Sequence, residues 1–201
     1  MTPSVPVAQP RFAAAMGSIR ARGLRSSVSS LRQVLAARWD LRSTTMLGVV
    51  RLDGRAAVIN NGTITIHDRV RLAGRTVRLE LVCQRGAELS IGYRTFVNYG
   101  TNISAMKAVH IGQDCDIGQY CIIMDSDYHD VDDHHLPGKS APIVIDDDVW
   151  LGARTIVLRG AHIGRGAVIG ANSVVTGDIP PFTFAAGNPA RVIRSIGKNH
   201  D

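Results

Sequence analysis

The stretch IDDDVWLGARTIVLRGAHIGRGAVIGANSVV, residues 145–175, repeats with a period of six. The same spacing extends upstream to Ile91, with a two-residue slip after Ile103 and an irregular segment after Ile123. A helix requires a period near 3.6, so these positions cannot share one helical face. All of the periodic positions are Ile, Leu or Val: Ile91, Val97, Ile103, Ile111, Ile117, Ile123, Ile145, Leu151, Val157, Ile163, Ile169 and Val175.

A small side chain lies two residues before many of these aliphatic positions, and that spacing puts both on one face of a strand. Six extended residues span roughly 20 Å, so three such sides close a triangular coil of about eighteen residues. The sequence therefore predicts an all-β fold, a hexapeptide parallel β-helix, with irregular first coils between Leu47 and Ser90. The small residues are Thr95, Thr101, Cys115, Cys121, Thr155, Ala161, Ala167 and Ser173.

The chain divides into a basic N-terminal arm (1–45), a β-helix domain (46–185) with a loop insertion (125–142), and a C-terminal tail (186–201). The arm contains seven arginines and one aspartate, which accounts for the net charge of +6 because the remainder balances. Between about Leu24 and Leu41 the apolar residues step by three or four and predict a helix. Its apolar stripe is Leu24, Val28, Leu31, Leu35 and Trp39.

Two interpretations of this helix remain open. It could cap the open end of the solenoid, or it could lie on an anionic membrane surface. Nucleic-acid binding is not expected, because no groove-reading motif accompanies the arginines. Three cysteines without a CxxC pair favour a reducing cytoplasm. No apolar run reaches the length of a membrane span, and the N-terminus lacks a secretory signal.

The insertion DSDYHDVDDHHLPGKSAP, residues 125–142, concentrates aspartate and histidine between two regular coils. Loops on rigid scaffolds are where binding and catalysis concentrate. Imidazole, with an ordinary pKa of about 6.5, is suited to general base catalysis near neutral pH. The insertion is therefore the first candidate for a functional site.

Three stretches resemble the hexapeptide-repeat acyltransferases, especially the galactoside and maltose O-acetyltransferase branch. They are FVNYGTNIS (96–104), IMDSDYHD (123–130) and the long segment from Val149 to Ile196. The resemblance implies a left-handed β-helix, a homotrimer with active sites between subunits, and acetyl-coenzyme A as acyl donor without a metal. It further implies transfer of the acetyl group to a hydroxyl of a sugar or glycan.

The same resemblance assigns site residues. His129 would be the catalytic base and Asn98 would bind the acceptor, with Asp125 and Asp127 as further substrate contacts. Either aspartate could orient the imidazole, and the sequence does not choose between them. Gly177 stands where this family often has lysine, which implies one missing phosphate contact. The coenzyme would be bound by Trp150, Ala153, Ala171, Thr176, Arg191 and Arg194.

Two other functions fit the same scaffold. A zinc-dependent hydratase or lyase of the γ-carbonic-anhydrase type would use His129 and His134, with His110 as the third ligand. A non-enzymatic binding subunit is the other, since a fold does not imply a function. The acceptor, O- versus N-acetylation and the acyl chain length are left open.

Overall fold

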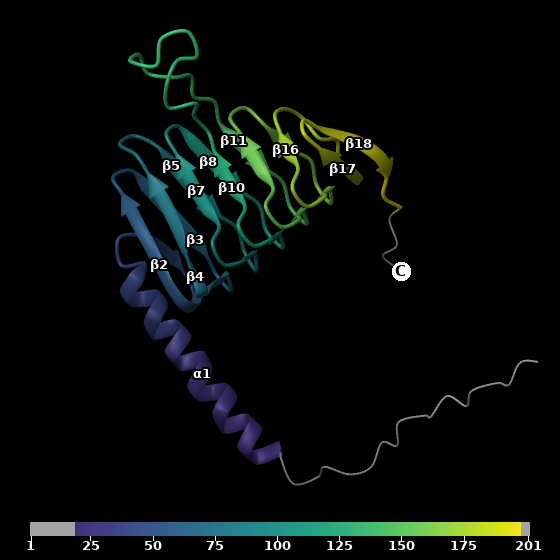
Figure 1. Ribbon diagram of the computed structural model, residues 1–201. Helices are drawn as coiled ribbons and strands as arrows, with labels where there is room; N and C mark the ends of the chain where they lie inside the picture. Colours follow the sequence, from purple (N-terminus) through teal and green to yellow (C-terminus); the bar gives the residue numbers. More distant parts are fainter. Residues whose placement is uncertain (1–18, 198–201) are drawn as a thin grey trace, which may run out of the picture.

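The computed structural model describes residues 19–197, with side chains from residue 29 onward. It forms a parallel β-solenoid with one helix at its N-terminal end (Figure 1). The elements are α1 (Ile19–Asp40), β1 (Thr45–Leu47), β2 (Arg51–Asn60), β3 (Thr63–His67), β4 (Arg71–Cys83), β5 (Glu88–Ile91), β6 (Phe96–Val97), β7 (Asn102–Ala105), β8 (Ala108–Ile111), β9 (Asp116–Ile117), β10 (Ile122–Met124), β11 (Ile143–Ile145), β12 (Trp150–Leu151), β13 (Ile156–Leu158), β14 (His162–Ile163), β15 (Val168–Ile169), β16 (Val174–Val175), β17 (Thr183–Gly187) and β18 (Ala190–Ser195).

The strands stack into three faces. Face 1 is the six-stranded sheet β1-β3-β5-β8-β11-β14. Face 2 contains β6, β9, β12, β15 and β17, and face 3 contains β7, β10, β13 and β16. The long strands β2 and β4 each run through a corner and contribute to faces 2 and 3, where they form the irregular first coils. Strand β18 pairs antiparallel with β17 and ends the solenoid.

The predicted core is confirmed. All twelve periodic aliphatic residues are at most 3% exposed, and the small residues that precede them are also buried. Each occupies the interior of a coil, directly above and below its counterpart, as in the pairing of Ile103 with Ile123 and of Ile123 with Val157. The slip after Ile103 lengthens that coil to a twenty-residue step, whereas Leu151 pairs with Ile169 eighteen residues later.

The corners depend on a backbone conformation that the repeat pattern did not reveal. The residue just before the small buried residue has positive φ at successive corners, for example Asp114 (φ 56), Arg154 (φ 59) and Asn172 (φ 58). At Gly166 (φ 65) a Cβ would also approach the Phe182 ring to 2.7 Å. Left-handed residues at these positions turn the chain from one face to the next.

The helix corrects one expectation. Helix α1 begins five residues earlier than predicted, at Ile19, and ends at Asp40. Its buried Ala37 and the next residue after the helix, Leu41, pack onto the first coil. Leu31, Leu35 and Trp39 of the apolar stripe are 60%, 55% and 69% exposed, so this stripe does not form the packing face. Small alanine side chains let the helix approach β2, and the larger residues point away. The side chains of Leu24 and Val28 lie outside the described residues.

Only the last turns of α1 lie against the solenoid, and the rest of the helix projects from it (Figure 1). Within residues 19–197, no helix combines the length and the hydropathy that a membrane crossing requires.

Candidate active site

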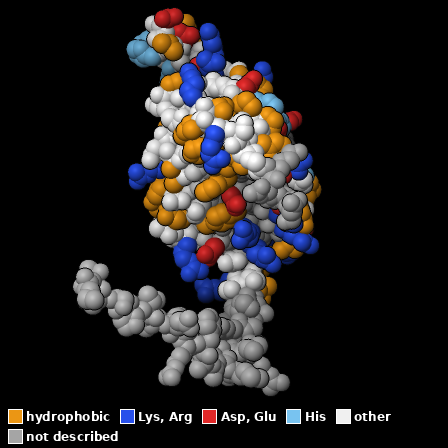
Figure 2. Space-filling model, turned by 90° about the vertical axis from the view of Figure 1, so that its right-hand side faces the viewer, with side chains coloured by type: hydrophobic (Ala, Val, Ile, Leu, Met, Phe, Trp, Pro, Cys, Tyr) orange, Lys and Arg blue, Asp and Glu red, His pale blue; other side chains and the backbone are white. Residues whose placement is uncertain are grey.

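The insertion between β10 and β11 forms a two-stranded stalk that stands out from the solenoid (Figure 1). Its two sides are joined by backbone hydrogen bonds, from Asp127 N to Lys139 O (3.0 Å) and from Asp130 N to Leu136 O (3.0 Å). Histidine side chains gather on the tip (Figure 2). A stalk of this kind presents a side chain at a distance from the coil to which it is anchored.

His129 lies on this stalk with an exposed ring. Its Nδ1 atom is 2.8 Å from the backbone carbonyl oxygen of His134. A carbonyl oxygen only accepts hydrogen bonds, so Nδ1 of a neutral ring carries the proton and Nε2 retains its lone pair. The imidazole is therefore held in the tautomer that can accept a proton from a hydroxyl at Nε2.

The expectation that Asp125 contacts substrate or His129 is wrong. Asp125 is completely buried, and its carboxylate accepts backbone N–H groups of Met106, Lys107 and Ala108, each at 2.7 Å. These three residues form the corner where two extra residues interrupt the six-residue repeat, between Ile103 and Ile111. A buried carboxylate needs several donors to be stable, and this corner supplies them.

The Asp127 carboxylate bonds Arg159 rather than the imidazole. It accepts a hydrogen bond from Nε of Arg159 at 2.5 Å, which ties the stalk to the residue that follows β13. Tyr128 adds a second anchor, with its hydroxyl 2.6 Å from Ser104 Oγ on β7. The orienting group on His129 is thus a backbone carbonyl rather than a carboxylate. No residue type marks such a group, so sequence reasoning had no signal for it.

Face 2 contains a groove of about 660 Å³. It brings together four of the predicted site residues: Asn98, Trp150, Ala153 and Ala171. Trp150 is 56% exposed, and Val168 is its register partner on the next coil. Phe96, Asp116 and Phe184 also line the groove and were not singled out from the sequence. The sequence could have identified them, because residues at equivalent repeat positions on neighbouring coils stack in one column, and these three stack with Trp150.

Asn98 is held in place at the edge of this groove. Its Oδ1 accepts the backbone N–H of Tyr99 (2.9 Å), and its Nδ2 lies 3.5 Å from Gln119 Oε1. The two basic tail residues lie at the C-terminal end of the same face. Arg194 lies opposite Phe184, with its guanidinium 5.8 Å from the ring centroid, and Arg191 lies opposite Ala186. Apolar walls with cations at one end could accommodate a long thiol ester bearing phosphates.

Thr176 and Gly177 lie outside the groove. They follow β16 on face 3, where Thr176 is exposed and a Cβ on Gly177 would meet no atom within 4 Å. The structure of one chain therefore does not bring Thr176 together with the other predicted coenzyme contacts.

His129 and the groove lie on opposite edges of face 3. The groove reaches the corner at Gln119, just before β10, whereas the stalk leaves the other end of β10 after Met124. Five extended residues span roughly 16 Å. The width of a face thus separates the imidazole from the groove of its own chain.

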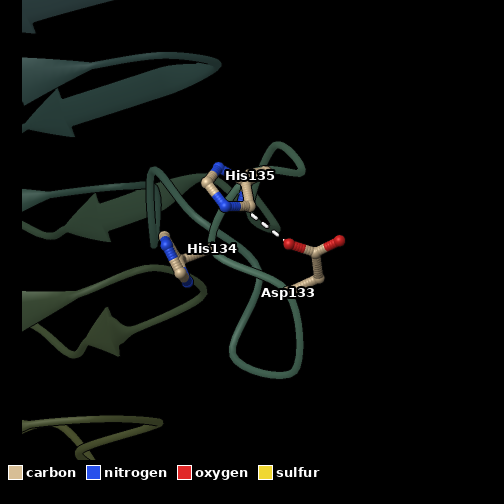
Figure 3. Close-up of side chains that lie close together, drawn as sticks. All are labelled: Asp133, His134 and His135. Carbon is tan, nitrogen blue, oxygen red and sulfur yellow. Dashed lines mark hydrogen bonds between the residues drawn. The ribbon is translucent and has the colours of Figure 1, made fainter.

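The tip of the stalk also holds a group of potential metal ligands, Asp133, His134 and His135 (Figure 3). All three are exposed, and Asp133 Oδ1 already accepts the backbone N–H of His135 at 2.9 Å. His110 is on face 1, with Nδ1 3.0 Å from Ser90 Oγ. The three histidines of the zinc hypothesis are not gathered in one chain.

The cysteines are part of the core. Burial raises the pKa of Cys115 to about 12 and that of Cys121 to about 11. Each thiol points to a carbonyl oxygen of the adjacent coil, Asp146 O at 3.1 Å and Gly152 O at 3.3 Å. Protonated, buried thiols are poor nucleophiles.

The fold and site define a class: a left-handed parallel β-helix that carries a histidine stalk and a groove on separate edges. Comparisons agree. The family model of bacterial transferase hexapeptides (six repeats) matches residues 142–177. The polySia-specific acetyltransferase NeuO is 30% identical over 78% of this chain and 74% of its own, with a TM-score of 0.65.

Two further crystal structures cover most of the chain. The hexapeptide-repeat acetyltransferase VCA0836 of Vibrio cholerae, in complex with acetyl-coenzyme A, is 26% identical over 94% of each chain, with a TM-score of 0.58. A maltose O-acetyltransferase from Clostridium difficile is 26% identical over 92% of this chain and 90% of its own, with a TM-score of 0.59. This chain belongs to the hexapeptide-repeat acyltransferase family.

The chain matches only part of the length of its curated relatives, which include a probable acetyltransferase of Mycobacterium tuberculosis that is 36% identical over 112 residues. The matched segments span 37%, 55% and 61% of the length of three of them.

Proposed function

We propose that this protein transfers the acetyl group of acetyl-coenzyme A to a hydroxyl of a sugar or glycan. The supporting observation is the fixed tautomer of His129, whose Nδ1 faces the His134 carbonyl and whose Nε2 is exposed. Nε2 removes the proton of the acceptor hydroxyl as that oxygen attacks the thioester carbonyl. The imidazolium then returns the proton to the departing thiolate, so the enzyme ends the cycle unchanged.

The acyl donor would lie in the face 2 groove. Trp150, Ala153 and Ala171 would contact its pantetheine arm, and Arg191 and Arg194 would meet its phosphates at the C-terminal end. The neighbour of known structure from Vibrio cholerae was solved with acetyl-coenzyme A, which supports this donor. NeuO and the maltose O-acetyltransferase support a sugar acceptor, with Asn98 as the contact nearest the hydroxyl.

A homotrimer would complete the site. Face 3 carries an outward column of half-buried aliphatic residues, Ile122, Ile156 and Val174, which is suited to contact with another copy. In a closed ring, the stalk of one copy would place His129 at the groove of the next copy. Thr176, also on face 3, would approach the same groove from the other side.

Thiol release from acetyl-coenzyme A in the presence of a panel of sugar acceptors tests the activity. We expect His129→Ala to lower kcat at least ~100-fold. His135→Ala is the matched control, since His135 lies on the same stalk tip and has no role in the proposed step. A His129→Ala enzyme that transfers as fast as wild type rules out this mechanism.

A complementation experiment tests the shared site. Ala171→Trp fills the groove and His129→Ala removes the base, so each variant alone is inactive. Refolding equal amounts together would restore about one quarter of wild-type activity, because half of the histidines and half of the grooves are intact. No recovery in mixed trimers, shown to form by mass spectrometry, contradicts sharing.

We also propose that α1 holds the enzyme peripherally at the cytoplasmic face of a membrane. Leu31, Leu35 and Trp39 form an exposed line on the helix, and Arg32 and Arg38 flank it without an ion pair among the described residues. An apolar stripe bordered by arginines is suited to an anionic lipid surface.

A further inference from the structure

A second pocket of about 360 Å³ lies beyond the N-terminal end of the groove on face 2. Asp116 lines both, so the two pockets adjoin. Four guanidinium groups surround this second pocket: Arg51, Arg69, Arg71 and Arg94. We refer to them as the arginine pocket.

The arginine pocket carries a net positive charge, because four arginines and only two aspartates, Asp114 and Asp116, line it. Arg94 pairs with Asp114 (2.5 Å) and Arg69 approaches Asp68 (3.5 Å). Arg51 and Arg71 are direct register partners on neighbouring strands, and neither forms an ion pair within residues 29–197. Like charges directly opposite each other in a sheet are destabilising, so a bound anion between them would relieve their repulsion.

Aromatic rings orient these side chains. The guanidinium of Arg71 lies 5.0 Å from the ring centroid of Phe96, and those of Arg69 and Arg94 lie 5.6 Å and 5.4 Å from the ring of Tyr93. An arginine held over a ring keeps its N–H groups free at the edge of its plane, where carboxylate and phosphate bind in bidentate fashion. Less side-chain entropy is then lost on binding.

The position of the pocket relates it to the acceptor. Phe96 pairs with Arg71, and Arg71 with Arg51, so the two unpaired guanidiniums extend one and two coils beyond the acceptor segment. Neighbouring strands are about 4.8 Å apart. Phosphate contacts of the donor are proposed at the opposite end, near Arg194. The arginine pocket is therefore separate from the donor and lies roughly 5–10 Å beyond the acceptor, about one sugar residue away.

Resting on the proposed acetyl transfer, we infer that the acceptor is an anionic sugar whose negative group, on or next to the acetylated residue, binds Arg51 and Arg71. A carboxylate of an acidic glycan and a phosphate of a phosphate-linked sugar share this chemistry.

Three acceptors show whether the bound group is a carboxylate or a phosphate: an acidic oligosaccharide, a sugar phosphate, and their neutral counterpart. We expect at least tenfold higher kcat/KM for one or both anionic acceptors than for the neutral one. In Arg51→Gln/Arg71→Gln, the ratio of anionic to neutral kcat/KM should fall at least tenfold. Arg78→Gln, an exposed arginine on β4 outside the pocket, is the charge-matched control and should leave the ratio unchanged.

A binding measurement separates this inference from the proposed function. Calorimetric titration of His129→Ala with the two anionic acceptors reports on the pocket without turnover, and Arg51→Gln/Arg71→Gln in that background should weaken binding at least tenfold. Equal ratios in variant and wild type, or equal binding with and without the two arginines, overturn the inference. Wild type that binds anionic sugars through these arginines yet never releases thiol contradicts the proposed function instead.

Discussion

Gly138 lies directly against the backbone of His129. A Cβ added at residue 138 would lie 2.6 Å from His129 O, 2.7 Å from its N and 2.8 Å from its C. These atoms belong to the opposite side of the stalk, where Gly138 N donates to Tyr128 O at 3.2 Å. The position of the candidate base therefore depends on a residue with no side chain.

Gly138→Ala should displace His129 and lower kcat at least ~10-fold, because small misplacements of a catalytic group are costly. KM for acetyl-coenzyme A should change little, since the groove is on another face. Steady-state kinetics test this, with Gly197→Ala as control because an added Cβ there meets nothing within 4 Å. An unchanged kcat would show that the stalk tolerates the shift.

Gly177→Lys should lower KM for acetyl-coenzyme A about three- to tenfold, because a lysine ammonium there could reach a phosphate of a donor bound between copies. Gly177 offers open space for a side chain. Gly177→Gln supplies similar length without charge and should not show the effect. A gain equal in both variants would point to packing rather than charge.

Asp125→Asn should lower the free energy of unfolding by about 2–3 kcal/mol, since an amide presents N–H groups to buried backbone donors. Urea unfolding measures the change. Asp132→Asn, an exposed aspartate on the stalk, should stay within ~0.5 kcal/mol of wild type. If both variants unfold at the same urea concentration, the carboxylate does not stabilise the corner.

Stability should fall as the pH rises from about 9 to 11. The pKa values of Cys115 and Cys121 are raised in the fold from 9.0 to about 12 and about 11. Above pH 9 the unfolded chain loses thiol protons that the folded chain retains, so the unfolded state gains stability. Urea unfolding across this range tests the slope. Cys115→Ala/Cys121→Ala retains every other titrating group and should show a shallower decline, and an identical slope contradicts the assignment.

Vesicles of anionic phosphatidylglycerol should co-sediment wild-type protein, and phosphatidylcholine vesicles should not. Leu31→Ser/Leu35→Ser/Trp39→Ser should reduce this association at least ~10-fold, and added salt should weaken it in wild type. Val131→Ser, 92% exposed on the stalk, is the control. If the triple variant instead changes only the oligomeric mass, the stripe is covered by another copy.

The six-residue repeat by itself determines the solenoid fold. Ile, Leu or Val recurs at every sixth position, and a coil with three sides of six residues buries all of these side chains in its interior. Ile103, Ile123 and Val157 stack in this way inside successive coils. The small residues were equally readable, because an interior corner admits no larger side chain. The insertion at 125–142 was also visible, as the place where the period fails.

Other features depend on contacts between residues distant in sequence, which a repeat pattern does not encode. Asp125 was grouped with His129 because the two are close in sequence. In the folded chain its carboxylate instead accepts hydrogen bonds from the backbone N–H groups of residues 106–108. Helical periodicity predicted that α1 exists but not which side of it packs on the solenoid. The helix approaches β2 through its small alanine side chains, and the large apolar side chains lie on another side. Separation of His129 from the groove follows from the width of one face, and only closing the coil decides which edges lie together.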